Sequence, residues 1–235
     1  MSTTNIKLHY YQIELVKKLS QAVFIRFNDL IIKGLESEHM NYHLKKLINL
    51  GFVQKMSSKY TLTDIGKDYS NMLDENSSLP EKQPKTSIII HAKRKNPKGQ
   101  VEHLLSKRLR QPYFGKVGHP TGKVKFGEKV QEAAERELFE ETGLKAKKFY
   151  LERIYRKMRK KDGLWVQDVI FFIFLVKDLS SKLIAKTPLQ ENFWISGNAL
   201  KKRASLDLYD DFTLDDHMTP KPLTFTEISA EAKGF

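Results

Sequence analysis

The sequence predicts an α+β protein with a small N-terminal domain of helices and one hairpin, followed by a larger domain of strands around one helix. Three observations predict this class. Apolar residues recur at helical spacing in the first 75 residues, a polar stretch with two prolines follows, and β-branched runs mark the rest. A chain of 235 residues has room for two such domains.

Composition excludes several kinds of site. The chain has no cysteine, which excludes disulfides and thiolate metal sites. Its first residues lack the apolar core of a signal peptide, and its longest apolar run, residues 169–176, is too short to cross a bilayer. We therefore expect a soluble, cytoplasmic protein without membrane contact.

The net charge of +13 is spread unevenly. Residues 1–75 carry 10 basic and 8 acidic side chains, a net of +2, so the remaining residues carry a net of +11. The densest block, residues 145–161, has nine basic residues against one acid. Such a block attracts nucleotides, nucleic acid or other polyanions. A solvated strand edge that keeps the protein soluble explains it equally well.

The first domain, residues 1–75, should contain four helices and a hairpin. Apolar side chains at helical spacing predict the helices, and Thr63 is placed to cap the last of them. A short hairpin should follow Gly51, with residues 56–59 at its tip. The expected helices span residues 10–22, 28–35, 39–50 and 64–73.

The run YHLKKLINLGFVQKMSSKYTLTDIG, residues 42–66, resembles the recognition helix and wing of bacterial and archaeal winged-helix regulators. In that family the recognition helix enters the major groove of DNA and the wing contacts the backbone. The resemblance therefore implies double-stranded DNA as a partner. A winged helix used for dimerisation or protein contact is the alternative, and it leaves a homodimer open. The residues expected to face DNA are Asn41, Tyr42, Lys45, Lys46 and Lys59.

Residues 76–86 are polar and carry Pro80 and Pro84, which favours a linker. The second domain should then span residues 87–218, with residues 219–235 as a C-terminal tail. Apolar and β-branched runs predict its strands, and a helix is expected near its end. The expected strands are residues 87–92, 101–107, 149–157, 165–176 and a segment from 192 to 196, and the late helix is residues 205–217.

One helix of the second domain carries a dense acidic face. Residues 128–142 contain no proline or glycine, and at 100° per residue Glu137, Glu140 and Glu141 fall within an arc of roughly 100°. Arg136 is spaced to pair with Glu132 and Glu140, which does not neutralise the cluster. Hard cations such as Mg²⁺ take carboxylate ligands, so a metal site is one explanation and a solvated acidic face is the other. Two alanines one turn earlier, Ala133 and Ala134, would leave room for a ligand.

The stretch GKVKFGEKVQEAAERELFEETGL, residues 122–144, resembles the Nudix box, G-x5-E-x7-R-E-U-x-E-E-x-G-U with U aliphatic. The resemblance implies an α/β/α sandwich and hydrolysis of a nucleoside diphosphate linked to another group, with Mg²⁺ or Mn²⁺ as cofactor. Thr121 departs from the glycine that often precedes the box. Every position of the pattern is filled, by Gly122, Glu128, Arg136, Glu137, Leu138, Glu140, Glu141, Gly143 and Leu144.

The family's roles carry over to matching positions. The resemblance implies metal binding by Gly122, through its carbonyl, and by Glu137, Glu140 and Glu141, which with Arg136 form the expected catalytic set. Arg136 should orient the glutamates, and Glu128 should pair with Arg136. The general base is either a box glutamate or an acid on a later segment. The later candidates are Glu191 and Asp168.

The substrate is the least determined part of the prediction. Lys160 and Lys161 stand where some subfamilies carry a diagnostic proline or tyrosine. Aromatic residues that would stack on a base are Tyr155, Trp165 and Phe193. The alternative function is a transcription regulator whose Nudix domain senses a nucleotide metabolite such as ADP-ribose. Such members usually lack intact box residues, so the complete box favours the enzyme.

Overall fold

The structure, a computed structural model, describes residues 7–74, 80–202, 206–209, 212 and 221–231. The chain divides into two compact units, Met1–Lys82 and Gln83–Phe235. This division falls inside the stretch expected to be a linker, residues 76–86. Each unit has its own buried apolar core.

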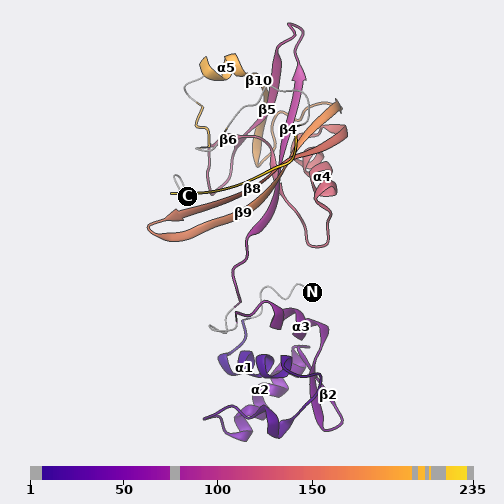
Figure 1. The fold of residues 1–235 in the computed structure, drawn as a ribbon, viewed down its shortest axis with the longest axis vertical. Helices are drawn as coiled ribbons and strands as arrows, with labels where there is room; N and C mark the ends of the chain where they lie inside the picture. The colour runs from indigo at the N-terminus through magenta and orange to yellow at the C-terminus, as the bar shows by residue number, and fades with distance from the viewer. Residues whose placement is uncertain (1–6, 75–79, 203–205, 210–211, 213–220, 232–235) are drawn as a thin grey trace. The chain divides into compact units, whose positions relative to one another are not determined.

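The N-terminal unit packs its helices against a small antiparallel sheet with β3 in the centre, between β1 and β2. Its core includes Leu15, Leu44 and Phe52, whose side chains are almost completely buried. In chain order its elements are α1 Tyr10–Ser20, β1 Ile25–Arg26, the 3₁₀ helix η2 Phe27–Leu30, α2 Ser37–Asn49, β2 Val53–Met56, β3 Lys59–Leu62 and α3 Asp64–Asn71 (Figure 1).

The helix expected over residues 28–35 is wrong. The chain forms only η2 there, and at Ile31 the backbone turns extended, with ψ of 126°. Two adjacent β-branched residues, Ile31 and Ile32, disfavour helix continuation, and Gly34 takes a left-handed φ of +83° that ends any helical path. The apolar residues here have helical spacing, but the chain does not form the α-helix that this spacing predicts.

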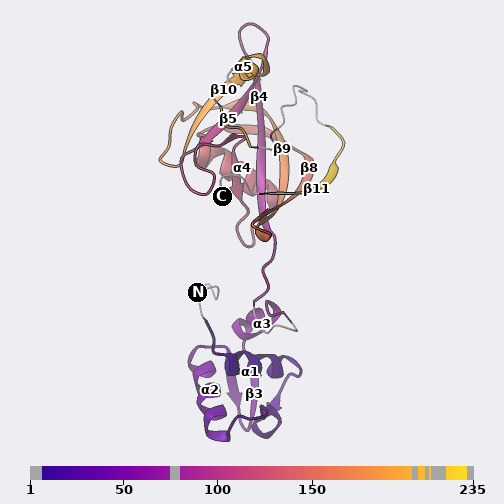
Figure 2. The ribbon, with the colours of Figure 1, turned by 90° about the vertical axis from the view of Figure 1, so that its left-hand side faces the viewer.

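The C-terminal unit is dominated by one mixed sheet with the strand order β10-β5-β4-β9-β8-β11, to which β6 and β7 add at β5 and β4. Figure 2 shows β4 running through the middle of the unit, between β5 and β9. Its strands are β4 Lys85–Lys95, β5 Val101–Arg108, β6 Val117–Gly118, β7 Thr121–Lys123, β8 Lys145–Lys161, β9 Leu164–Ser180, β10 Gln190–Ser196 and β11 Thr224–Glu231, and its helices are α4 Val130–Thr142 and α5 Gly197–Lys202.

The strand β4 changes partners along its length. From Lys85 to Ala92 it runs parallel to β9, and from Lys93 to Lys95 it pairs antiparallel with β5. Its alternate residues Ile88 and Ile90 are fully buried and pack with α4 in the main core. The strand β4 therefore joins the β5 and β9 sides of the sheet and supplies apolar contacts to one face of α4.

The strands β8 and β9 are longer than the expected segments 149–157 and 165–176. Each has 17 residues, and they pair from Lys145–Ser180 to Lys161–Leu164. The basic block is thus a strand in which Lys and Arg alternate with apolar residues such as Ile154 and Met158. The strand ends are rich in charged residues, so a prediction based on apolar runs made both strands too short.

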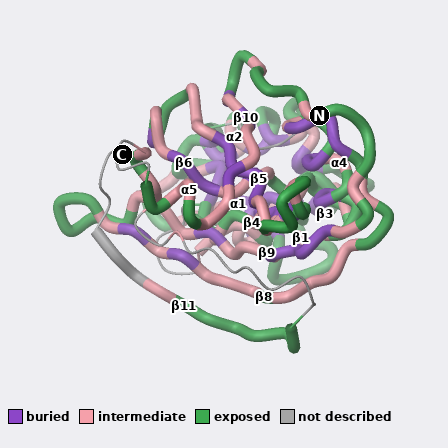
Figure 3. Tube along the Cα trace, turned by 90° about the horizontal axis from the view of Figure 1, so that it is seen from above, coloured by how far each residue is buried: buried purple, intermediate pink, exposed green. Residues whose placement is uncertain are grey.

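Two expectations for the C-terminal part need correction. The helix expected over residues 205–217 lies largely outside the described residues, and its described part, residues 206–209, is not helical, since Leu208 bridges Val117. Residues 219–235, expected as a tail, include β11, which pairs parallel to β8 and whose first residues, 224–227, are exposed (Figure 3). Among the described residues of this unit only α4 and α5 are α-helices, so the sandwich has few helices and a large sheet.

Candidate active site

The helix α4 is built to present its acidic side chains at a defined place. Its apolar side, with Ala133, Ala134 and Leu138 fully buried, packs against β4 in the main core. The two alanines therefore allow close packing of helix on sheet, and the expectation that they leave room for a ligand is wrong. Gly143 ends the helix with a left-handed φ of +73° and donates its N–H to the Phe139 carbonyl at 2.8 Å.

Gly122 lies on β7 directly beside Glu137. A Cβ atom at Gly122 would overlap the Glu137 side chain at Cγ, Cδ and Oε2. The absence of a side chain at Gly122 is therefore what admits the Glu137 carboxylate, which is 8% exposed. The close approach places the Gly122 backbone and a helix carboxylate at one point, which is a physical reason for glycine at the first position of the box.

The guanidinium of Arg136 joins the acidic side chains into one network. Its Nε and Nη2 donate to the two carboxylate oxygens of Glu128 at 2.6 and 2.8 Å. Its Nη1 donates to Glu137 at 2.7 Å and to Glu140 at 3.0 Å, and its Nη2 also donates to the Lys123 carbonyl at 2.9 Å. Charge-assisted bonds of this kind are among the stronger ones in proteins, so Arg136 orients three carboxylates at once.

The ionisation of this network follows from these bonds. The Arg136 guanidinium and the Lys125 backbone N–H lower the pKa of Glu128 to about 2. The same bonds, with Glu128 first, raise the pKa of Arg136. The expected pairing of Arg136 with Glu128 is present. Its expected pairing with Glu132 is not, because Glu132 turns to the helix start and accepts the Lys129 N–H at 3.3 Å.

Glu141 differs from its neighbours because Arg136 does not reach it. Burial is the main cause that raises its pKa, followed by the charges of Glu137 and, more weakly, Glu140. Positive charge from Arg110 and Arg108 partly offsets this. Within the described part of the chain its carboxylate accepts no hydrogen bond. A half-buried carboxylate in this setting favours a bound cation.

The chemistry of these donors fits a hard divalent metal. The described residues contain no group of three or more His, Asp or Glu side chains already arranged around a metal position. The donor set is nevertheless all oxygen: the carboxylates of Glu137, Glu140 and Glu141, with Gly122 lying against the Glu137 side chain. The uncompensated charge at Glu141 supports the same assignment, because Mg²⁺ and Mn²⁺ are bound by few carboxylates plus water and phosphate oxygens.

A small basic pocket lies on the Glu141 side of the sheet. Its volume is about 30 Å³, and it combines three cationic side chains, Arg108, Arg110 and Lys116, with polar groups. Arg108 and Arg110 are close enough to influence the charge on Glu141. Guanidinium groups of this kind suit phosphate oxygens. The full lining is Ser106, Arg108, Arg110, Lys116, His119, Thr121, Gln190 and Tyr209.

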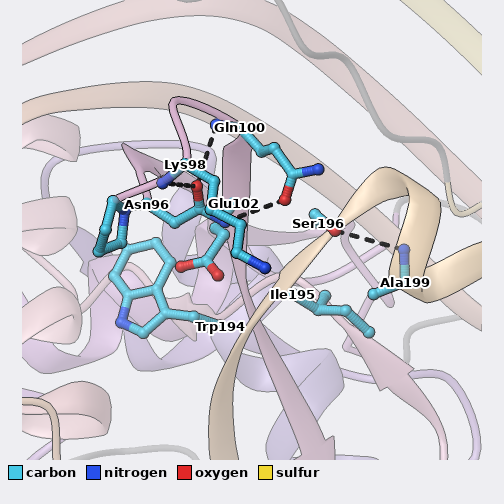
Figure 4. Close-up of a pocket in the computed structure, with 9 residues that line it drawn as sticks. Asn96, Lys98, Gln100, Glu102, Trp194, Ile195, Ser196 and Ala199 are labelled. Carbon is cyan, nitrogen blue, oxygen red and sulfur yellow. Dashed lines mark hydrogen bonds between the residues drawn. The ribbon is translucent and has the colours of Figure 1, made fainter.

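A larger, open cavity of about 370 Å³ lies at the opposite end of β5 and β10. It is bounded by the β4–β5 turn, with Trp194 and Glu102 on its wall (Figure 4). In the strand register Ser196 pairs with Glu102, whereas Asn192, next to the end of α4, pairs with Ser106. This cavity shares no lining residue with the basic pocket and is lined by none of the clustered glutamates, so we do not include it in the candidate active site.

The later acids expected as a general base are both engaged elsewhere. Glu191 pairs with Lys186 at 2.7 Å, and Asp168 pairs with Arg156 at 2.9 Å. Glu141, in contrast, has no such ion pair among the described residues, and burial raises its pKa. The box glutamates are therefore the better candidates for accepting a proton.

The aromatic residues expected to stack on a base do not line the basic pocket. Tyr155 stacks on Phe171, Phe193 packs in a small cluster around Leu105, and Trp165 is 54% exposed beneath the Lys160 ammonium. None of the residues that do line it was expected from the sequence as a substrate contact. Its one signal was the basic run KRLR, residues 107–110, at the end of a strand.

In the N-terminal unit the residues expected to contact DNA lie on two elements. Four belong to α2, where Asn41 is partly buried, Tyr42 is 55% exposed and the two lysines are exposed. The Lys46 ammonium lies 5.8 Å from the centre of the Tyr42 ring. Lys59 is exposed at the start of β3. Among the described residues of either unit, no helix is long and apolar enough to span a membrane.

Comparison with known proteins gives one family and a set of solved structures. The family model described as NUDIX domain matches residues 84–212. A comparison with curated proteins gave no match. Similar solved structures include a MutT NUDIX hydrolase from Burkholderia pseudomallei, 25% identical over 56% of this chain and 92% of that one, with a TM-score of 0.43. Others are the NUDIX domain of Shewanella oneidensis NrtR in complex with ADP ribose (16%, 64% and 92%, TM-score 0.47) and a C. elegans Ap4A hydrolase binary complex (18%, 52% and 85%, TM-score 0.38).

The match to the NUDIX domain covers more than half of the chain and includes the complete box with its Arg136 network. The chain therefore belongs to the Nudix family.

Proposed function

We propose that this chain is a Nudix hydrolase that cleaves the P–O–P bridge of a nucleoside diphosphate linked to another group, with Mg²⁺ or Mn²⁺ as cofactor. The observation that carries the proposal is the Arg136 network, which holds Glu137 and Glu140 in place. It leaves the half-buried Glu141 to a cation. The basic pocket beside Glu141 supports an anionic substrate.

Each part of the chain has a defined task in this proposal. Glu137, Glu140, Glu141 and the Gly122 carbonyl would hold the metal, and Arg136 orients two of the carboxylates. When bound, the metal polarises a phosphate oxygen and lowers the pKa of a water, which supplies the nucleophile. The pocket arginines bind the phosphates and orient the bridge for attack.

Proton transfer from the water needs a base within hydrogen-bond reach. Because Glu191 and Asp168 are held in ion pairs, we assign this role to a box glutamate. Glu141 fits best, since burial and neighbouring carboxylates raise its pKa and strengthen it as a proton acceptor. Glu141 would then serve both as a metal ligand and as the proton acceptor.

The test is a panel of nucleoside diphosphate derivatives incubated with the full chain in Mg²⁺ or Mn²⁺. We expect metal-dependent release of products cleaved at the diphosphate bridge, abolished by a chelator. The matched control is Glu135→Gln, which removes an acidic side chain from the exposed side of α4, where Glu135 only accepts from Gln131. No turnover of any substrate in either metal would contradict the hydrolase.

We propose DNA binding as a second function, located on α2. The element order of the N-terminal unit is similar to a winged helix, and α2 presents exposed Tyr42, Lys45 and Lys46 on one side. Cations and an aromatic ring on an exposed helix suit the phosphate backbone and base edges of a duplex. A mobility-shift assay with duplex DNA tests this.

The same assay distinguishes the regulator from the enzyme. If the Nudix domain only senses a metabolite, adding a nucleotide such as ADP-ribose changes the DNA affinity while no nucleotide is hydrolysed. If both functions are present, hydrolysis of the nucleotide reverses the shift with time. Binding that is unaffected by any nucleotide assigns the two units independent roles.

A further inference from the structure

A buried polar network joins β5 and β10 to the last turn of α4. Asn192 donates through Nδ2 to the Glu141 carbonyl at 2.8 Å and to the Ile184 carbonyl at 2.9 Å. Its Oδ1 accepts from the Ser106 hydroxyl at 2.6 Å and from Gln190 Nε2 at 2.8 Å. Gln190 Nε2 also donates to the Glu141 carbonyl at 3.2 Å. The three polar side chains are at most 9% exposed.

This network supplies hydrogen-bond donors to the Glu141 carbonyl at the C-terminal end of α4. The last four carbonyls of an α-helix lack intrahelical donors, and a buried carbonyl without a donor is costly. In α4 the Phe139 carbonyl accepts from Gly143, and the Thr142 carbonyl accepts from the Ile184 N–H at 2.8 Å. The Glu141 carbonyl accepts from two side-chain amides of β10. The main chain at Glu141 is therefore fixed to the sheet and not only to its own helix.

The position of the network links two parts of the candidate active site. Ser106 and Gln190 also line the basic pocket, so they touch the space proposed for phosphate. Their hydrogen bonds run from there through Asn192 to the residue whose carboxylate Arg136 does not hold. Arg136 orients Glu137 and Glu140 from one side of α4, and the network fixes Glu141 from the other side.

We propose that Asn192, supported by Ser106 and Gln190, is a positioning residue that sets the backbone of Glu141 for metal binding. The inference rests on the proposed function, because it concerns the same carboxylates. Asn192 does not itself contact the reacting atoms, and its effect passes through the Glu141 main chain. Partners one step removed from a metal commonly change its affinity by about 10- to 100-fold when they are lost.

The test measures Mn²⁺ binding by isothermal titration calorimetry on the full chain, beside thermal unfolding and the Mn²⁺ concentration for half-maximal activity. We expect Asn192→Ala to weaken Mn²⁺ binding about 10- to 100-fold. Saturating Mn²⁺ should restore most of kcat. Ser106→Ala, which removes one support of the Asn192 amide and is less disruptive to folding, should weaken binding less. Asn198→Ala, at an exposed position of α5, is the matched control and should bind Mn²⁺ like the wild type.

The outcomes separate the inference from the proposed function. A wild-type chain that binds no Mn²⁺ overturns the proposed function, and the inference with it. A wild type that binds, with Asn192→Ala and Ser106→Ala folded and of equal Mn²⁺ affinity, overturns the inference alone and leaves Asn192 a packing role. Loss of activity in proportion to the unfolded fraction, at every Mn²⁺ concentration, is the signature of that packing role.

Discussion

The helices α2 and α4 are equally long and each has one polar face, but the side chains of the two faces are held in opposite ways. Both α2 and α4 have 13 residues. The polar side of α2 is exposed, and its Lys46 ammonium lies 5.8 Å from the centre of the Tyr42 ring. The polar side of α4 is tied by Arg136 to Glu128, Glu137 and Glu140. An exposed face takes its final geometry from a partner, whereas on α4 two of the three clustered carboxylates, Glu137 and Glu140, are already fixed by Arg136.

The two faces also differ in the kind of electrostatic interaction that they can make. Exposed lysines act over a distance and lose their effect as salt increases. Half-buried carboxylates that repel one another respond to a metal ion and to changes of a fraction of an ångström. Variants of α4 should therefore change hydrolysis without changing DNA affinity, and variants of α2 should do the reverse.

The largest effect is expected at Glu141. Glu141→Gln keeps the shape of the side chain but removes the charge that we propose binds the metal. We expect kcat/KM to fall by about 10²- to 10⁴-fold, because metal stabilisation of the transition state is worth several kcal/mol. The control Glu135→Gln should retain activity, and neither variant should change DNA affinity. Hydrolysis by Glu141→Gln at the wild-type rate would remove Glu141 from the metal site.

The next effect is expected at Gly122. Gly122→Ala adds a methyl group where the Glu137 carboxylate lies, so Glu137 must move. We expect activity to fall about 10- to 100-fold from the displaced ligand. The free energy of unfolding should change by only about 1 kcal/mol, because the displaced group is the end of a flexible side chain. Activity assays and denaturant titration measure the two effects.

The control for this variant is Gly127→Ala. Gly127 has open space around it but a left-handed φ of +78°, so alanine there causes backbone strain without a steric overlap. It should reduce stability by about 1 kcal/mol and leave activity unchanged. If the two glycine variants lose activity equally, strain near the helix start, and not the position of Glu137, explains the loss.

The local parts of the site were predictable from the sequence. The α4 helix, its glycine end and the common face of Glu137, Glu140 and Glu141 depend on neighbours within a few turns, and the pattern of residues 122–144 specifies them. The same holds for β5, which was expected over residues 101–107 and spans Val101–Arg108, whereas β4 extends beyond the expected residues 87–92 at both ends. Elements that depend on near neighbours in the chain can be predicted from the spacing of residues in the sequence.

The parts that depend on distant pairing were not predictable. The contact between Ser106 and Asn192 joins residues 86 positions apart, and nothing local marks either one. Arg108 and Arg110 looked like two members of a scattered basic composition until the sheet placed them beside Glu141. The converse failure was the helix expected over residues 28–35, where the apolar spacing was helical but the backbone turns extended at Ile31.

The third effect concerns the exposed helix. The pair Lys45→Ala and Lys46→Ala should weaken duplex binding about tenfold at low salt. It should also reduce the slope of log affinity against log salt by about 2, one for each lost phosphate contact. Fluorescence anisotropy over a salt series measures both, and hydrolysis should be unchanged. The matched control is Lys201→Ala with Lys202→Ala on α5, an equal change of charge in the other unit. If both pairs lower affinity equally, net charge and not the α2 face binds DNA.

The smallest expected effect concerns whether charge holds Arg136 and its carboxylate partners on α4 in place. The pKa of Glu128 is lowered from 4.5 to about 2 by Arg136 and the Lys125 N–H. A carboxyl group with a depressed pKa stabilises the fold above its unfolded pKa, and this stabilisation is lost as the pH falls through the folded value. Glu128→Gln should therefore unfold at a lower temperature than the wild type at pH 7. The gap should close between pH 4.5 and about 2, as measured by circular dichroism.

The control for Glu128 is again Glu135→Gln, which makes the same charge change on the exposed side of α4 and should show little difference at any pH. A gap for Glu128→Gln that stays constant with pH would mean that shape and hydrogen-bond count, and not ionisation, hold Arg136 in place. The contrast between the two helices would then be one of packing. A gap that closes with acid would show that the α4 face keeps its geometry through charge, so that loss of one carboxylate loosens the others.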